Sequence, residues 1–325
     1  MRLNALVVSW LVAAIALAAS QACAEDYPTR QATIVVPFTP GGATDILARL
    51  VGQKLEQRLG KPFVVENRPG AGMQIGTMAV AKAAPDGYTL LVAPSSALAV
   101  NVTLYKKLPY DPAKDFVPLS LLAHLPFMLL VNPSLPVHSV ADLIKLAKEK
   151  PGAFSFGSGG VGASHHLLGE LLKSMAGIEA THVPYKGTVP ALTDLMAGHI
   201  QFVFSDFPPA LELVRAGKLR ALGVTTAKRV AAAPEIPPIN DQLPGFDVTP
   251  WQMLAAPAGT PGPVVERLHA EVKAIMGSPE VQKQLTDTGV IPGQPATTAE
   301  LQRFVESEIV RWGKIVRQAG AAGLE

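Results

Sequence analysis

The sequence IVVPFTPGGATDILA, residues 34–48, joins a short β-branched run to two prolines, a glycine pair and the start of an amphipathic pattern. Prolines end a strand, and glycines allow a sharp turn and a close approach of the backbone to a ligand. We therefore expect a strand over 34–36, a loop, and a helix with apolar residues from Ile46 to Leu59. The free N–H groups and the positive dipole end of such a helix favour an anion. An ordinary strand-to-helix turn, with glycine serving only the geometry, is the alternative.

The first 24 residues have the pattern of an export signal. Arg2 precedes an apolar run over 5–19, and Ala22-Cys23-Ala24 fits a cleavage site between Ala24 and Glu25. The run is shorter than the ~20 apolar residues that span a membrane. A lipid anchor on Cys23 is the alternative, but the residues before it lack the expected aliphatic side chain. We expect cleavage after Ala24 and export to the periplasm.

The composition limits the classes of function. The chain has 28 Lys and Arg against 26 Asp and Glu, and Cys23 is its only cysteine. Near-neutral charge without a basic cluster gives no electrostatic case for nucleic acid. Cleavage would remove the only thiol, which excludes disulfides and thiolate chemistry. A mature chain of ~300 residues is long enough for two domains.

Strand-like and helix-like segments alternate along the chain, which predicts an α/β fold with mostly parallel sheets. The uncharged stretch 116–137 is broken by prolines, so we expect two buried strands, 119–123 and 128–132, with a change of domain near Leu125-Pro126. A proline-rich linker over 234–244 and a returning strand over 248–255 would follow. The expected domains are residues 25–124 with 248–325, and residues 125–247.

Four further loops share the character of the first, because each is small, polar and placed after a strand. Ligands of open α/β sheets bind beyond the carboxyl ends of the strands, so a cleft between two domains would collect these loops. Gly, Ser and Thr are also common at turns for conformational reasons, so only the set together predicts a site. Asp206, at a strand end, is the candidate for contacting a ligand amine or hydroxyl. The loops are Pro94-Ser95-Ser96, 157–164, Lys186-Gly187-Thr188 and Ser205-Asp206.

Catalytic and cofactor motifs are weak. Residues 157–162 match GxGxxG, but Glu179 precedes the next strand and so lies at the wrong end to reach a ribose. The histidines show no metal-ligand spacing, and no serine has a recognisable base. We expect no metal, no cofactor and no catalysis. An exported enzyme acting on a small acid, with His166 or Asp206 as general acid or base, is the alternative.

Taken in order, the motifs resemble one family, the periplasmic receptors of tripartite tricarboxylate transporters, known as Bug or TctC-like proteins. The resemblance covers essentially the whole mature chain. Met73-Gln74 departs from it, standing where a glycine and a small polar residue are usual, and Val102 stands where proline is common. The matching stretches are 37–45, 66–72 (ENRPGAG), 85–90 (PDGYTL), 110–116, 182–187 (HVPYKG), 219–222, 256–261 and Arg311-Trp312.

The resemblance implies a type II, two-domain periplasmic binding protein, a Venus flytrap whose hinge the chain crosses twice. Such a protein closes on a small organic carboxylate, held by backbone amides and ordered water, and meets membrane transporter subunits transiently. We expect a monomer. A module that feeds a sensor kinase is an alternative with the same chemistry. Carried over by position, the ligand-binding residues would be Phe38, Gly41, Gly42, Ala43, Thr44, Asp45, Ser95, Ser96, Ser158, Gly162, Ser164, His166, Gly187, Thr188 and Asp206.

Overall fold

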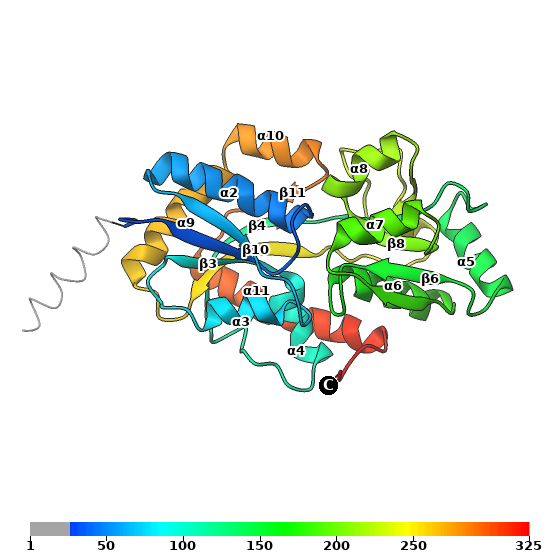
Figure 1. Ribbon diagram of the computed structural model, residues 1–325, viewed down its shortest axis with the longest axis horizontal. Helices are drawn as coiled ribbons and strands as arrows, with labels where there is room; N and C mark the ends of the chain where they lie inside the picture. Colours follow the sequence, from blue (N-terminus) through cyan, green and yellow to red (C-terminus); the bar gives the residue numbers. More distant parts are fainter. Residues whose placement is uncertain (1–26, 325) are drawn as a thin grey trace, which may run out of the picture.

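The structure is a computed structural model that describes residues 27–324, so the predicted export signal and the predicted cleavage site at Ala24 and Glu25 lie outside the described residues. Two lobes lie side by side, and each consists of a β-sheet flanked by helices (Figure 1). The predicted α/β architecture with two domains is confirmed.

The first lobe contains a six-stranded sheet in the order β11-β4-β10-β3-β1-β2. Helices α2, α9 and α10 cover one face of this sheet, and α3, α4 and α11 cover the other (Figure 1). The strands are β1 (Ala32–Val36), β2 (Phe63–Asn67), β3 (Thr89–Pro94), β4 (Phe116–His124), β10 (Trp251–Pro257) and β11 (Ile291–Pro292). The helices are α2 (Ala43–Leu59), α3 (Gln74–Ala81), the π-helical turn η1 (Ser96–Val100), α4 (Asn101–Leu104), α9 (Gly262–Met276), α10 (Pro279–Asp287) and α11 (Thr298–Gln318).

The second lobe contains a five-stranded sheet in the order β7-β6-β8-β5-β9. Its strands are β5 (Phe127–Val131), β6 (Ser155–Ser158), β7 (Thr181–Pro184), β8 (Phe202–Asp206) and β9 (Arg220–Val224). Its helices are α5 (Val140–Glu149), α6 (Ser164–Ala176), α7 (Thr188–Met196), α8 (Phe207–Arg215) and the 3₁₀ turn η2 (Ile239–Asp241).

Both sheets are mixed, whereas the sequence predicted mostly parallel sheets. β1 pairs in parallel with β2 and β3, and β6 pairs in parallel with β7 and β8. In contrast, β10 is antiparallel to β3 and β4, and β5 is antiparallel to β8 and β9. β5 and β10 are the strands that follow the two crossings between the lobes. Each starts at the interlobe side, and it therefore runs opposite to the strands that lead toward that side.

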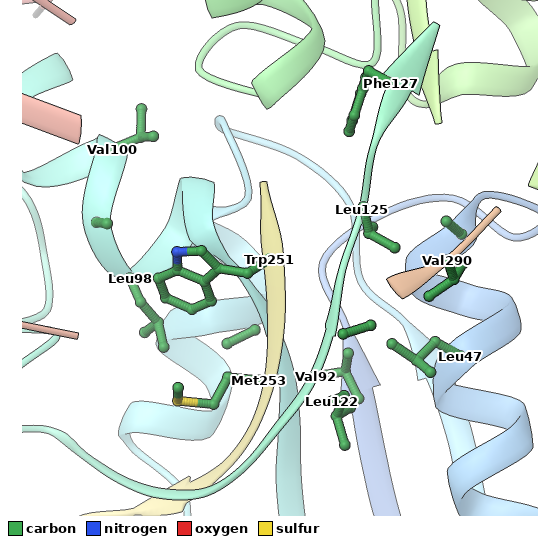
Figure 2. Packing of buried hydrophobic residues seen from close by; sticks show 14 of the residues in the cluster. Leu47, Val92, Leu98, Val100, Leu122, Leu125, Phe127, Trp251, Met253 and Val290 are labelled. Carbon is green, nitrogen blue, oxygen red and sulfur yellow. The ribbon is translucent and has the colours of Figure 1, made fainter. Parts of the chain in front are cut away.

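The two crossings lie against each other. The first joins β4 to β5, and the N–H of Leu125 donates to the carbonyl of Pro250, just before β10, at 2.7 Å. Figure 2 shows Leu125 and Phe127 along the first crossing, with Leu125 turned toward Leu47 and Val290 of the first lobe. The crossings are thus held together by a main-chain hydrogen bond and by apolar packing.

The predicted linker over 234–244 is instead packed against the second lobe. Ile236 and Ile239 are buried, and the N–H of Val224 donates to the carbonyl of Pro237 at 2.9 Å. Apolar side chains between the prolines explain the difference, because their burial is favourable. The prolines here shape a packed segment.

The main hydrophobic core runs continuously through both lobes, with a second cluster confined to the second lobe. Trp251 and Met253 on β10 face Leu98 (Figure 2). The indole N–H groups of Trp251 and Trp312 both donate to the carboxylate of Glu308 on α11, at 2.7 and 3.0 Å. The bond from Trp251 fixes the start of β10 to α11, whereas the bond from Trp312 lies within α11. Across residues 27–324, the helices are all too short or too polar to cross a membrane.

Candidate functional site

A small cavity lies between the lobes, at the carboxyl ends of strands from both sheets. Its volume is about 20 Å³, which is room for about one water molecule. The loops after β1 and β3 bound it on one side, and the loops after β6, β7 and β8 bound it on the other. It is lined by Phe38, Thr39, Gly42, Ala43, Thr44, Pro94, Ser96, Leu125, Phe127, Ser164, His165, Gly187, Thr188, Asp206, Pro250 and Gln252.

Direct contacts close the lobes on each other around this cavity. The hydroxyls of Ser96 and Ser164 are 3.1 Å apart, and the N–H of Ala43 donates to the carboxylate of Asp206 at 2.7 Å. Gly162 packs so closely on the first lobe that an added Cβ would lie 2.4 Å from a methyl group of Leu104. The structure therefore shows the closed arrangement of the two lobes.

Four helices begin at the cavity. The first turns of α2, α6 and α7 line it through Ala43, Ser164 and Thr188, and α8 follows directly after Asp206. First-turn N–H groups have no acceptor within their own helix, and each helix start carries a positive partial charge. An anion at one helix start is stabilised by typically ~0.3–1 kcal/mol, and more where the site is partly buried. The convergence of four helix starts, one from the first lobe and three from the second, thus favours a bound anion.

Among residues 27–324, Asp206 is the one carboxylate that lines the cavity. One of its oxygens accepts the N–H of Ala43, and the other accepts the hydroxyl of Thr188 at 3.1 Å and lies 3.4 Å from His165 Nε2. Burial would raise the pKa of Asp206, but the hydrogen bonds from His165, Ala43 and Thr188 outweigh it and hold the pKa below its usual value. The carboxylate is therefore ionised, and protein donors hold both of its oxygens.

Four side-chain polar atoms of residues 27–324 are buried without a hydrogen-bond partner, and all lie at the surface between the lobes. They are Ser95 Oγ, Asn101 Oδ1, His165 Nδ1 and Gln252 Oε1. His165 and Gln252 line the cavity, Ser95 precedes the lining residue Ser96, and Asn101 faces Gly162 of the opposite lobe. Buried polar groups in proteins nearly always have a partner, so these atoms mark a place where a ligand or water completes the structure.

The structure brings nine of the fifteen predicted ligand-binding residues to the cavity: Phe38, Gly42, Ala43, Thr44, Ser96, Ser164, Gly187, Thr188 and Asp206. The other six, Gly41, Asp45, Ser95, Ser158, Gly162 and His166, lie close by without lining it.

Asp45 is turned back into its own lobe. Its carboxylate accepts bonds from the N–H of Gly41 and from the side chains of Arg49 and Asn67 at 2.9–3.0 Å. Burial would raise the pKa of Asp45, but these bonds outweigh it and hold the pKa below its usual value. Asp45 therefore fixes the shape of the glycine turn that carries the start of α2.

His165 occupies the position for which the sequence suggested His166. Adjacent residues on a helix point in different directions. The ring of His166 stacks on that of His182, with centroids 4.0 Å apart, and both rings stack on Phe156. His182 Nε2 lies 2.6 Å from Ser158 Oγ, which holds Ser158 away from the cavity. Thr39, His165 and Gln252 are the polar lining residues that the predicted set does not contain. The available signal for Gln252 was a lone polar residue within the apolar stretch 251–257.

Acid should destabilise the protein through the stacked histidines. Burial and the charge of Lys173 lower the pKa of His166 to about 4, and burial and the neighbouring His166 and Lys173 lower that of His182 to about 3. The unfolded chain takes up these protons near pH 6.5, so stability falls as the pH drops from about 6.5 toward 4, by at most ~1.4 kcal/mol per pH unit for each ring.

Denaturant unfolding at pH 7, 6 and 5 tests this expectation. His182→Gln should show a shallower fall than the wild type, while His199→Gln, which changes an exposed ring, should not. Burial also lowers the pKa of His124, so part of the slope remains in every variant. An unchanged slope in His182→Gln would contradict the assignment.

A second, larger cavity of about 630 Å³ adjoins the first, and Phe38 lines both. It is bounded by the first-lobe loop 69–74 and Tyr105, and by residues 159–161 and 184–186 of the second lobe. Met73, which lines it, has a φ of +71°. This left-handed conformation explains physically why glycine suits the position. Among the described residues there is no group of three His, Cys, Asp or Glu side chains placed to hold a metal ion.

Two lobes closed over a site that offers helix starts to an anion define a solute-binding protein. The family profile described as "Tripartite tricarboxylate transporter family receptor" matches residues 47–321, and the chain belongs to this family.

Three solved structures are similar to this chain over nearly their whole length. A structure of Rpa4515 from R. palustris with adipate is 42% identical, covering 92% of this chain and 100% of that one, with a TM-score of 0.89. The periplasmic binding protein BugD is 32% identical over 92% and 100%, with a TM-score of 0.87. MatC from Rhodopseudomonas palustris with bound malate is 34% identical over 89% and 100%, with a TM-score of 0.85.

Proposed function

We propose that the protein is an exported receptor that captures a small organic carboxylate between its lobes and delivers it to a tripartite tricarboxylate-type transporter. The convergence of helix starts from both lobes on one cavity carries the proposal. Adipate and malate, the molecules bound to Rpa4515 and MatC, are both small dicarboxylates and support it.

The ligand carboxylate would bind the first-turn N–H groups that Asp206 leaves free, those of α2 at Thr44 and of α6 at Ser164 and His165. The hydroxyls of Ser96 and Ser164 lie beside them. The small cavity accommodates a head group only, so the remainder of the ligand would extend past Phe38 into the larger cavity. An anion next to Asp206 is acceptable because four positive helix ends meet there.

The geometry of the site favours ligand binding over catalysis. Thr188, His165 and Asp206 contain the residue types of a catalytic triad, but a triad needs the two ring nitrogens to face different partners. Here Nε2 of His165 faces both Thr188 Oγ1, at 2.8 Å, and Asp206, whereas Nδ1 has no partner. The hydroxyl is thus not activated by a base that an acid orients. We infer that the group positions the lobes and transforms no substrate.

The remaining parts of the proposal concern export and organisation. We infer that residues 1–24 direct export to the periplasm and are cleaved before Glu25, and that the mature protein is a monomer. We further propose that residues 25–124 and 248–325 form one domain and residues 125–247 the other. Hinge closure would bury the ligand and present a closed surface to the transporter subunits.

A thermal-shift screen of small carboxylates on the chain that lacks residues 1–24 tests the proposal. A ligand present at a hundredfold excess over its dissociation constant adds about 2.7 kcal/mol to the stability, which is easily detected. We expect at least one dicarboxylate to raise the melting temperature in a concentration-dependent manner. If mono-, di- and tricarboxylates all leave it unchanged at millimolar concentration, the proposed ligand class is wrong.

A further inference from the structure

We propose that Gln252 accepts a hydrogen bond from a hydroxyl or amino group of the ligand, so that the receptor selects substituted carboxylates over their unsubstituted counterparts. The inference rests on the proposed function, namely that a carboxylate binds in the interlobe cavity. It concerns a residue of the crossing strand β10 rather than one of the loops.

The position of Gln252 is that of a side chain directed at a ligand. Gln252 is only 3% exposed, lines the cavity and carries a buried oxygen without a partner. The pairing register of β10 with β4 shifts between Gln252 and Met253. Such irregularities redirect a side chain and are common next to functional sites. The preceding residue, Trp251, is fixed by its bond to Glu308, so the start of the strand is held in place.

Two residues that lie near Gln252 at the cavity cannot donate a main-chain hydrogen bond to it. Pro94, its partner on β3, and Pro250, two residues before it, both line the cavity, and proline has no N–H. A buried carbonyl oxygen without a donor is costly unless a bound molecule supplies one. A molecule bound in the cavity is therefore placed to supply the missing donor.

The other polar side chains at the cavity are either bonded within the protein or also have an atom without a partner. The sequence suggested that Asp206 contacts an amine or hydroxyl of the ligand. Both of its oxygens already have donors from the protein. Nε2 of His165 faces the carboxylate of Asp206 and the hydroxyl of Thr188, and Nδ1 of the same ring has no partner. A carboxylate alone has no hydrogen to offer to the oxygen of Gln252. A ligand that carries a hydroxyl or ammonium group beside its carboxylate can bind the helix starts through the carboxylate and donate to Gln252 through the substituent.

Matched ligand pairs and a matched variant test the inference. Dissociation constants are measured by calorimetry for succinate against malate and aspartate, and for adipate against 2-hydroxyadipate and 2-aminoadipate. For the series, four-carbon or six-carbon, whose members bind the protein, we expect a substituted ligand to bind the wild type at least about tenfold more tightly than the unsubstituted one. Gln252→Met, which keeps the length of the side chain but removes the acceptor, should reduce this preference to less than about threefold.

Two controls separate this result from a folding defect. Denaturant unfolding establishes that Gln252→Met is folded, with Gln252→Leu as a second apolar variant, and Gln53→Leu, on the exposed side of α2, should keep the preference. Carboxylates that bind the wild type without any preference for a substituent would overturn the inference and leave the proposed function standing. A preference that survives in Gln252→Met would overturn it too, because another residue then accepts the hydrogen bond from the substituent. Absence of binding by every carboxylate would overturn both proposals.

Discussion

Asp206→Ala is expected to lower the free energy of unfolding by about 3 kcal/mol, the loss typical of breaking a buried, hydrogen-bonded charge cluster. The substitution leaves the N–H of Ala43, the hydroxyl of Thr188 and Nε2 of His165 without their shared acceptor. It also removes the negative charge from the meeting point of four helix starts and breaks the shortest hydrogen bond between the lobes around the cavity. Urea denaturation at pH 7 measures the change.

Two further variants give this prediction its controls. Asp206→Asn keeps the shape and one carbonyl oxygen, so it should lose less than Asp206→Ala. Asp287→Ala removes an exposed carboxylate whose partner is Lys283, and such surface pairs contribute ~0–1 kcal/mol. If Asp206→Ala costs no more than Asp287→Ala, Asp206 does not hold the lobes in the way described.

Gly42→Val is expected to reduce ligand affinity by more than about a hundredfold with little change in stability. Gly42 has φ −81° and ψ 169°, which any residue adopts, and an added Cβ would meet no protein atom within 4 Å. We expect the added side chain to take up space in the cavity that Gly42 lines, and a cavity of about 20 Å³ has no room for both an isopropyl group and a carboxylate. Calorimetry with a carboxylate that binds the wild type measures the loss.

Gly41→Ala is the matched comparison, because it changes the neighbouring glycine for a different reason. Gly41 has a φ of +93° and does not line the cavity. An alanine in this left-handed region costs about 1–2 kcal/mol, so the variant should be less stable and keep much of its affinity. Reversal of the two outcomes, with Gly41→Ala blocking the ligand and Gly42→Val only destabilising, would refute the assignment of the cavity.

The loops of the site could be predicted from the sequence because turn chemistry is local. A strand, a Gly-rich or Ser-rich turn and a helix pattern occur together at Gly41-Gly42 and again at 157–164, and both turns bound the interlobe surface. Strand direction, in contrast, is not encoded in a hydrophobic run. The antiparallel course of β5 and β10 follows from where the chain crosses between lobes, which is a property of the whole fold.

The direction of side chains at helix starts could not be predicted from the sequence for a similar reason. A shift of one residue in where α6 begins decides whether His165 or His166 faces the cavity, and helix boundaries are the least certain part of any sequence-based assignment. Gln252 was missed because its direction depends on an irregular pairing between two strands that are distant in sequence. The loops of the site could thus be predicted from the sequence, whereas the structure was needed to identify its buried polar contacts.

The most direct test of the central claim combines titration with recovery of the ligand. The chain that lacks residues 1–24 is titrated calorimetrically with the carboxylate that stabilises it most, and the bound molecule is then released by denaturation and identified by NMR. The account predicts saturation at one ligand per chain, loss of binding in Gly42→Val, and recovery of the ligand chemically unchanged. Release of an altered molecule, or equal binding by Gly42→Val, would contradict it.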